Sequence, residues 1–397
     1  MSRRIAATIC AAVLVSAAVP QVLAAGPPAQ LPVLTRVAAA LSGLKPRAPV
    51  RVDVVAPAAI ERQALRVLDR DYPRDRQAYD ERLYRALGLL GTGEPLRPVL
   101  VAEHVRGVRS LYDPVARRAW VRRGGTQREA AIHALVLALQ DQTFETRRAS
   151  GLRRGSRDAA LAAAAAVDGA AAFAGLQRRR TAGVRSPAAH EDSRIGLFVE
   201  LQAGFTGSTG ARFASLLHEV GTRTAVHAAL RRFPETTEQI FHLGKFLRRE
   251  QAKPVLLPAA AAGLELQDDD TFGELDVRAL LAVHQVPRLD HAAEGWGGGR
   301  SAHYRDAAGR DAFALVLDWD GDADAAEWAE AVATWVNEAF HADAPGPPPA
   351  TPCAVEFCWA VDGRSVAFAR RGTETALVLG PSLVAAERLA QALVRRD

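Results

Sequence analysis

The feature that most constrains the fold is the stretch AAIHALVLAL at positions 130–139. Wound as a helix, it is apolar almost all round, which indicates a helix that is buried on every side. We predict this helix over residues 126–147, and Thr126 with Glu129 has the spacing of a capping box at its start. Such burial requires a large core, which a chain of 397 residues with 49% hydrophobic residues can supply.

His133 is the only ionisable residue of this stretch. Zinc peptidases use the pattern H-E-x-x-H because two histidines four residues apart share one face of a helix and bind one ion. The glutamate beside the first histidine polarises the metal-bound water. His133 matches the first histidine, whereas Ala134 occupies the position of the glutamate and Leu137 that of the second histidine. From this spacing alone, His133 is only a histidine in a core helix.

The residues around His133 carry a more specific signal. The run YDPVARRAWVRRGGTQREAAIHALVLALQDQTF (112–144) resembles a family of exported, zincin-like predicted metallopeptidases of bacteria and archaea. The hallmark of that family is a hairpin with YDP and then a helix reading H-E-[LY]-x-H-A-L-Q-D-Q-H-F-D. Further along, AAVDGAAA places Asp168 where the family has the glutamate of its third metal ligand, and TTEQIFHLGKFL (236–247) resembles STEQILHPEKYL. Weaker matches extend the likeness over residues 100–395.

The resemblance implies a zincin-like fold, and the substitutions imply a lost metal site. Asp168 is one methylene shorter than glutamate, Leu137 cannot bind a metal, and Ala134 cannot act as a base. A catalytic zinc is held by three protein ligands, and loss of the general base lowers a rate by roughly 10²- to 10⁴-fold. We therefore expect no zinc cofactor and no catalytic residue, with His133, Leu137 and Asp168 as vestigial metal positions. The expected function is that of an inactive peptidase homologue with a binding or structural role.

Two alternatives to this interpretation stay open. One is an active zinc metallohydrolase with a rearranged, weak metal site. His190 and His218 each precede a glutamate, but neither is followed by a second histidine at the required spacing. The other is a helix that matches the family only by coincidence.

The order of patterns predicts an α+β fold with four segments. Residues 1–25 have the basic start, apolar run and small residues of a signal peptide, and residues 26–48 are rich in proline and predict a linker. We expect a zincin-like helical core with a β-hairpin over 49–265. Short β-rich runs that alternate with helices predict a smaller α+β module over 266–397.

The signal peptide predicts an exported protein of the periplasm, the cell envelope or the outside of the cell. Retention of the segment as a membrane anchor is the alternative. The alanine-rich run LAAAAAVDGAAAFAGL (161–176) contains an aspartate, so we interpret it as a buried helix of a soluble protein. No transmembrane span is predicted after signal removal.

Cys353 and Cys358 remain once the signal peptide is removed. Two lone cysteines outside the cytoplasm tend to pair. Their odd separation places them on opposite faces of a regular strand, so a disulfide between them requires a bend in the strand. The sequence leaves this disulfide open.

The distribution of charge along the chain indicates which classes of partner the protein can bind. The formal net charge is +5, and arginines far outnumber the three lysines. The arginines are scattered in short pairs, and no nucleic-acid-binding module is recognisable, so no nucleic-acid partner is predicted. We expect an unknown protein or peptide partner. One hypothesis is that an extended peptide adds to an exposed edge of the strand RRAWVRR (117–123).

Overall fold

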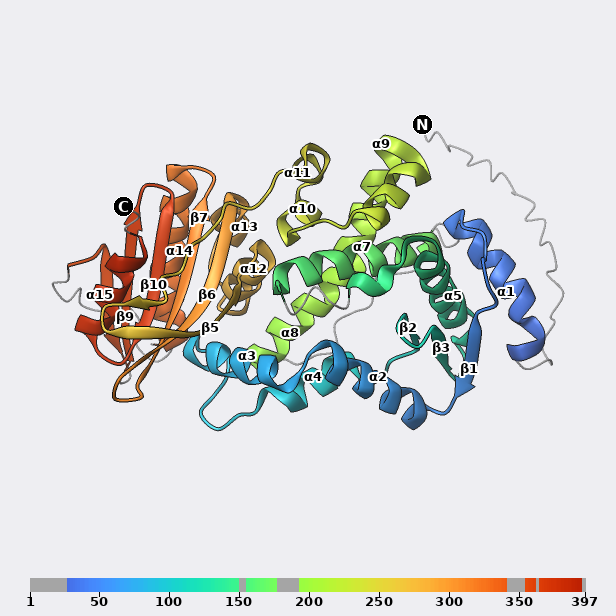
Figure 1. Cartoon of the computed structure of the whole chain (residues 1–397), viewed down its shortest axis with the longest axis horizontal. Helices are drawn as coiled ribbons and strands as arrows, with labels where there is room; N and C mark the ends of the chain where they lie inside the picture. The colour runs from blue at the N-terminus through green and yellow to red at the C-terminus, as the bar shows by residue number, and fades with distance from the viewer. Residues whose placement is uncertain (1–26, 150–154, 177–192, 341–353, 362–363, 395–397) are drawn as a thin grey trace, which may run out of the picture.

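A computed structural model describes residues 27–149, 155–176, 193–340, 354–361 and 364–394. A mainly helical part lies at one end of the molecule and a seven-stranded antiparallel sheet lies at the other (Figure 1). The predicted α+β fold class is thereby confirmed.

The helical part also contains a small three-stranded sheet. Its helices are α1 (Pro27–Ser42), α2 (Pro57–Asp71), α3 (Arg74–Ala86), α4 (Leu96–His104), α5 (Gln127–Phe144), the 3-10 turn η1 (Thr146–Arg148), α7 (Arg157–Leu176), α8 (Arg194–Gly204), the π-helix η2 (Phe205–Thr209), α9 (Gly210–Arg231), α10 (Thr237–Phe241) and α11 (Leu243–Arg248). Its strands are β1 (Arg51–Val55), β2 (Ser110–Asp113) and β3 (Arg118–Arg122).

Helix α5 occupies the core of the helical part, as its apolar sequence predicts. It contacts α1, α7 and strands β2 and β3, and Leu135 and Leu139 are fully buried. The predicted capping box is wrong, because the Thr126 side chain makes no cap hydrogen bond. Thr126 has φ −99° and ψ 17°, outside the extended conformation that lets an N-cap side chain reach the first turn. The helix ends at Phe144, where Glu145 adopts a left-handed conformation.

Residues 27–42, predicted as part of a linker, form helix α1 instead. Pro27 and Pro28 lie in the first turn, where the missing N–H groups have no intrahelical partner, whereas Pro32 lies inside the helix. Leu34 and Ala38, one turn apart, are buried in the same hydrophobic cluster as Ala131 and Leu135 of α5. Packing against α5 therefore orders a segment whose composition resembles that of a linker.

The small sheet confirms the predicted hairpin and adds a strand to it. Strands β2 and β3 pair antiparallel, and β1 pairs parallel to the other edge of β3. The order is β1-β3-β2, so β3 is the central strand. Val52 and Val54 contact the hydrophobic cluster that contains α5, and Trp120 of β3 lies opposite Asp53.

The large sheet has the order β4-β5-β6-β7-β10-β9-β8. Its strands and helices are β4 (Ala260–Ala261), β5 (Leu264–Thr271), α12 (Glu274–Val283), α13 (Leu289–Glu294), β6 (Trp296–Asp306), β7 (Asp311–Trp319), α14 (Asp322–Phe340), β8 (Phe357–Val361), β9 (Arg364–Arg371), β10 (Glu374–Gly380) and α15 (Leu383–Leu393). Alternation along β7 buries Leu315 and Leu317 with α12 and α14, and Ala314 and Val316 with α15. The sheet is therefore covered on both faces.

Buried charges join the helical part to the large sheet. Arg157, at the start of α7, lies 2.9 Å from Asp276 of α12, and both side chains are almost wholly buried. This contact is an ion pair rather than a well-aligned hydrogen bond. The next residue, Asp158, accepts hydrogen bonds from the amide and the hydroxyl of Thr237 in α10. The start of α7 is thus fixed to both α10 and α12.

Helix α7 lies between α5 and α9. By length and composition, its stretch from Arg157 to Gly175 is apolar enough to cross a membrane, and half of the window is buried inside the protein. Its first two residues are the buried charges described above, and Asp168 lies in its middle. These features are also those of a core helix in a soluble protein.

Candidate functional site

The positions that the family resemblance assigns to a metal site lie on α5 and α7, two helices that pack against each other. His133, Ala134 and Leu137 lie on α5, and Asp168 lies on α7. Ala134 is fully buried, and Leu137 packs against the hydrophobic cluster of the helical part. Apolar side chains therefore occupy the positions that the resemblance assigns to a general base and a second histidine.

His133 is partly buried, and burial lowers the pKa of its imidazole below the ordinary value. Its Nδ1 lies 3.5 Å from the hydroxyl of Ser110 in β2, at the outer limit of a hydrogen bond. The imidazole is therefore neutral at pH 7, and its neighbourhood in α5 is apolar.

Asp168 lies beside the close crossing of α7 and α9. A Cβ atom on the next residue, Gly169, would lie 2.1 Å from the backbone of Gly210, so only glycine allows this approach. Burial raises the pKa of the Asp168 carboxyl to about 6. Among the described residues, no group donates a hydrogen bond to this carboxylate or forms an ion pair with it. Asp168 is thus an acidic side chain whose charged form is disfavoured by its surroundings.

These residues do not fit a zinc ion. A catalytic zinc requires three protein ligands, and Leu137 has no donor atom. In the described part of the chain, three metal-binding side chains converge only at Glu238, Glu250 and Asp320, away from α5. The ammonium group of Lys245 forms ion pairs with all three of these carboxylates. A lysine therefore supplies the cation at that cluster.

The residues that carry the family resemblance have structural roles at the end of α5. Asp141 accepts hydrogen bonds from the Tyr112 hydroxyl (2.9 Å) and the Arg147 amide (3.0 Å), and thereby links the hairpin to the helix end. Gln142 accepts from the Arg47 amide and donates to the Ala48 carbonyl, which holds the segment before β1 against α5. Asp141 and Gln142 of the Q-D-Q pattern therefore hold neighbouring segments against the end of α5.

The segment TTEQIFHLGKFL has similar roles at the junction with the sheet. Thr236 caps α10 by accepting from the Gln239 amide. His242 Nε2 lies 3.0 Å from the buried carboxylate of Glu274, and this partner raises the pKa of the imidazole. Glu238 pairs with Lys245. These polar residues therefore cap α10, join α10 to α11 and join their connection to α12.

The glycines of GWGGGR allow close backbone contact. The Trp296 indole donates to the Phe272 carbonyl (3.0 Å). A Cβ atom on Gly298 would lie 2.3 Å from the Lys253 carbonyl oxygen, so a side chain cannot be accommodated there without movement. This motif lets the start of β6 lie close to the segment before β4.

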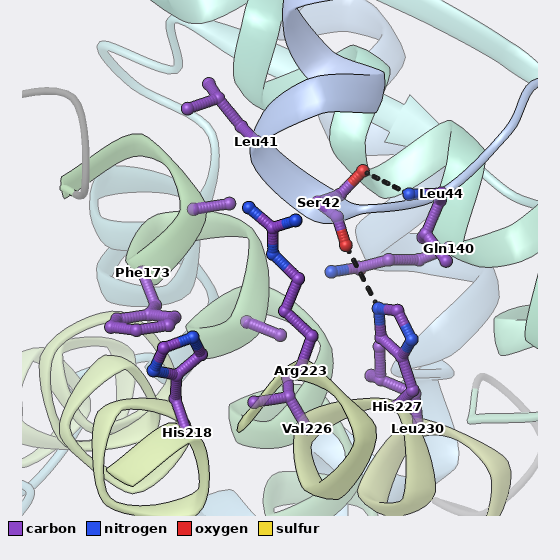
Figure 2. A pocket seen from close by; sticks show the side chains of 12 residues that line it. Leu41, Ser42, Leu44, Gln140, Phe173, His218, Arg223, Val226, His227 and Leu230 are labelled. Atoms are coloured by element: carbon purple, nitrogen blue, oxygen red, sulfur yellow. Dashed lines mark hydrogen bonds between the residues drawn. The ribbon is translucent and has the colours of Figure 1, made fainter. Parts of the chain in front are cut away.

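Of the two half motifs at His190 and His218, the structure describes only His218. His190 lies outside the described residues. The ring of His218, on α9, lies 5.4 Å from that of Phe173 and lines a small pocket between α1, α5, α7 and α9 (Figure 2). The pocket has a volume of about 20 Å³, which suits one or two water-sized groups. The Gln140 side chain points into it, with a buried Oε1 that has no partner among the described residues (Figure 2).

A larger groove of about 600 Å³ lies along β1. Four consecutive β1 residues, 52–55, line it together with Arg118, Trp120, Arg123 and Gln127. The hypothesis of an exposed edge at RRAWVRR is wrong, because β3 is covered by β1 on one side and by β2 on the other. Among the described strands, none pairs with the outer edge of β1. Sequence reasoning missed this groove because β1 and β3 are separated by more than 60 residues along the chain.

Cys358 is buried in β8. Cys353 lies outside the described residues, so the disulfide between them stays a prediction.

Comparison with known proteins gives one match. Residues 263–390 match a protein family described as a domain of unknown function (DUF8575). No curated protein matches the chain, and no solved structure matches it. The match begins just before β5 and ends within α15, and it covers less than half of the chain. The similarity therefore concerns the sheet and its helices.

Proposed function

We propose that this chain is an exported, peptidase-like protein that does not catalyse hydrolysis and acts by binding. The observation that carries the proposal is Leu137, which packs against the hydrophobic cluster at the position of a metal ligand. Ala134, fully buried at the position of the base, supports it further. The alternative of an active zinc hydrolase gains no support from the one carboxylate cluster found in the described residues, because Lys245 occupies it.

The binding mode that the geometry supports best is addition of an extended peptide to the outer edge of β1. N–H and C=O groups of successive residues point alternately to the two edges of a strand. The Val55 carbonyl accepts from the Arg123 amide beyond β3, so Val52 and Val54 direct their backbone groups toward the outer edge. A peptide strand there forms main-chain hydrogen bonds and places its side chains in the groove.

The test of the proposed function is metal content together with peptide hydrolysis. Purified mature protein is stripped with chelator, exposed to excess zinc and dialysed, and bound zinc is measured by mass spectrometry. We expect far less than one zinc per chain and no hydrolysis of a mixed peptide library. The matched variants are His133→Ala and His291→Ala, the latter on an exposed helix. Retention of one zinc that is lost in His133→Ala and kept in His291→Ala would overturn the proposal.

A further inference from the structure

The groove along β1 is lined on one side by residues of an arginine-rich stretch of the chain. Residues 106–128 contain seven arginines and one acidic residue, Asp113. Asp113 is buried and forms an ion pair with Arg70 at 2.8 Å, so it does not neutralise the arginines around it. The positive charge of this stretch is therefore concentrated on the hairpin and the start of α5.

Most of these arginines are exposed and have no acidic partner. Among the described residues, ion pairs are formed only by Arg118, with Asp53, and by Arg122, with Glu61 at 4.0 Å. The exposed arginines of this region for which the described residues supply no ion pair are Arg51, Arg106, Arg109, Arg117, Arg123 and Arg128. The charge is thus available to a partner.

Two of the arginines line the groove itself. Arg118 and Arg123 flank Trp120, and the Arg118 guanidinium lies 5.7 Å from the centre of the tryptophan ring. Asp53, the one acidic side chain in the lining, is already paired with Arg118. The groove therefore combines an aromatic floor, an unpaired guanidinium and the outer edge of a strand.

We propose that the groove binds an extended peptide whose acidic side chains pair with Arg123. This inference rests on the proposed addition of a peptide strand to β1 and specifies that the added peptide is acidic. Charge complementarity selects the acidic peptide, because positive and negative patches steer association and exclude partners of like charge. The outer edge of β1 selects an extended polypeptide over a polysaccharide or a membrane surface, since neither of these can form a ladder of main-chain hydrogen bonds.

The test uses the full mature chain and three fluorescein-labelled peptides in fluorescence anisotropy. Threonine alternates with glutamate in the first peptide, with serine in the second and with lysine in the third. We expect the glutamate peptide to bind about threefold more tightly than the serine peptide, with the advantage lost at high salt, as an exposed ion pair at Arg123 allows. The lysine peptide should bind more weakly than the serine peptide.

Variants assign the binding to the groove. Arg123→Gln should remove the glutamate preference and leave serine-peptide binding unchanged, and it keeps the Arg118–Asp53 ion pair. Arg371→Gln, at an exposed arginine of β9, is the matched control and should change neither. Val54→Pro removes an N–H from the outer edge and should weaken all three peptides, whereas Val54→Thr keeps that N–H and should not.

The outcomes separate the two proposals. Equal binding of the glutamate and serine peptides, still sensitive to Val54→Pro, would overturn the acidic preference and leave strand addition standing. No binding of any peptide would overturn both. Glutamate-peptide binding that is insensitive to Val54→Pro and is displaced equally well by dextran sulfate would identify a site for anionic polymers instead.

Discussion

Replacing Asp168 with asparagine should stabilise the protein at pH 8. The folded state raises the pKa of this carboxyl from 3.8 to about 6, because burial disfavours the charged form. A shift of this size corresponds to about 3 kcal/mol, and partial exposure of the side chain reduces the expected gain to about 1–3 kcal/mol. Asparagine keeps the shape of the side chain and removes the charge.

The gain should depend on pH in a defined direction. Below about pH 4 the carboxyl is protonated in both the folded and the unfolded chain, so the substitution has little effect. Between pH 4 and about 6 the folded chain holds more protons than the unfolded chain, so wild-type stability falls as pH rises. The advantage of Asp168→Asn should therefore grow over this range and reach its full size above about pH 7.

The assay is urea unfolding at pH 4, 6 and 8, followed by the fluorescence of the six tryptophans. Asp306→Asn is the control with the opposite sign, because hydrogen bonds from the Arg310 and Ala308 amides, together with the Arg310 side chain, lower the pKa of Asp306. That variant should lose stability at pH 8. If Asp168→Asn proves less stable than wild type at pH 8, the carboxylate has a stabilising partner, such as a metal ion, and the reasoning is refuted.

Three further substitutions test the scaffold, each by urea unfolding. Arg157→Met leaves Asp276 buried without a cation and should lower the free energy of unfolding by about 3–5 kcal/mol. Adding Asp276→Leu to this variant should recover part of the loss, and equal stability of the single and double variants would argue against a buried ion pair. Lys245→Met leaves three carboxylates together and should cost about 2–3 kcal/mol at pH 8. The cost should be smaller at pH 5, because burial raises the pKa of Glu238 to about 7 and this carboxyl is then protonated; a loss independent of pH would contradict this. Gly298→Ala should cost about 1–3 kcal/mol through overpacking, and an unchanged urea midpoint would show that the strand has room for a side chain.

The sequence predicted those elements whose signal is local. The all-round apolar run of α5, the alternation in β2 and β3 and the alanine-rich α7 were each found from a few consecutive residues. Helix α1 was missed because its proline-rich composition is typical of a linker, and only contact with α5 explains its order.

Features that depend on distant residues were not predictable. The ion pair of Arg157 with Asp276 joins residues more than 100 positions apart, and the pocket beside Gln140 is lined by four helices. The motif residues Asp141 and Gln142 were recognised by resemblance, but their roles followed only from their contacts with Tyr112 and Ala48. Periodicity describes one element at a time, so it cannot show how elements meet.

Because the chain has only three lysines, amine modification can report on the contact between the helical part and the large sheet. Lys45 is exposed, whereas Lys245 is held by three carboxylates and Lys253 bonds to the carbonyl of Trp319. An amine-reactive dye should therefore attach mainly at Lys45 and the chain's amino terminus while the protein is folded. Modification of the other two lysines would then report when the helical part and the sheet separate.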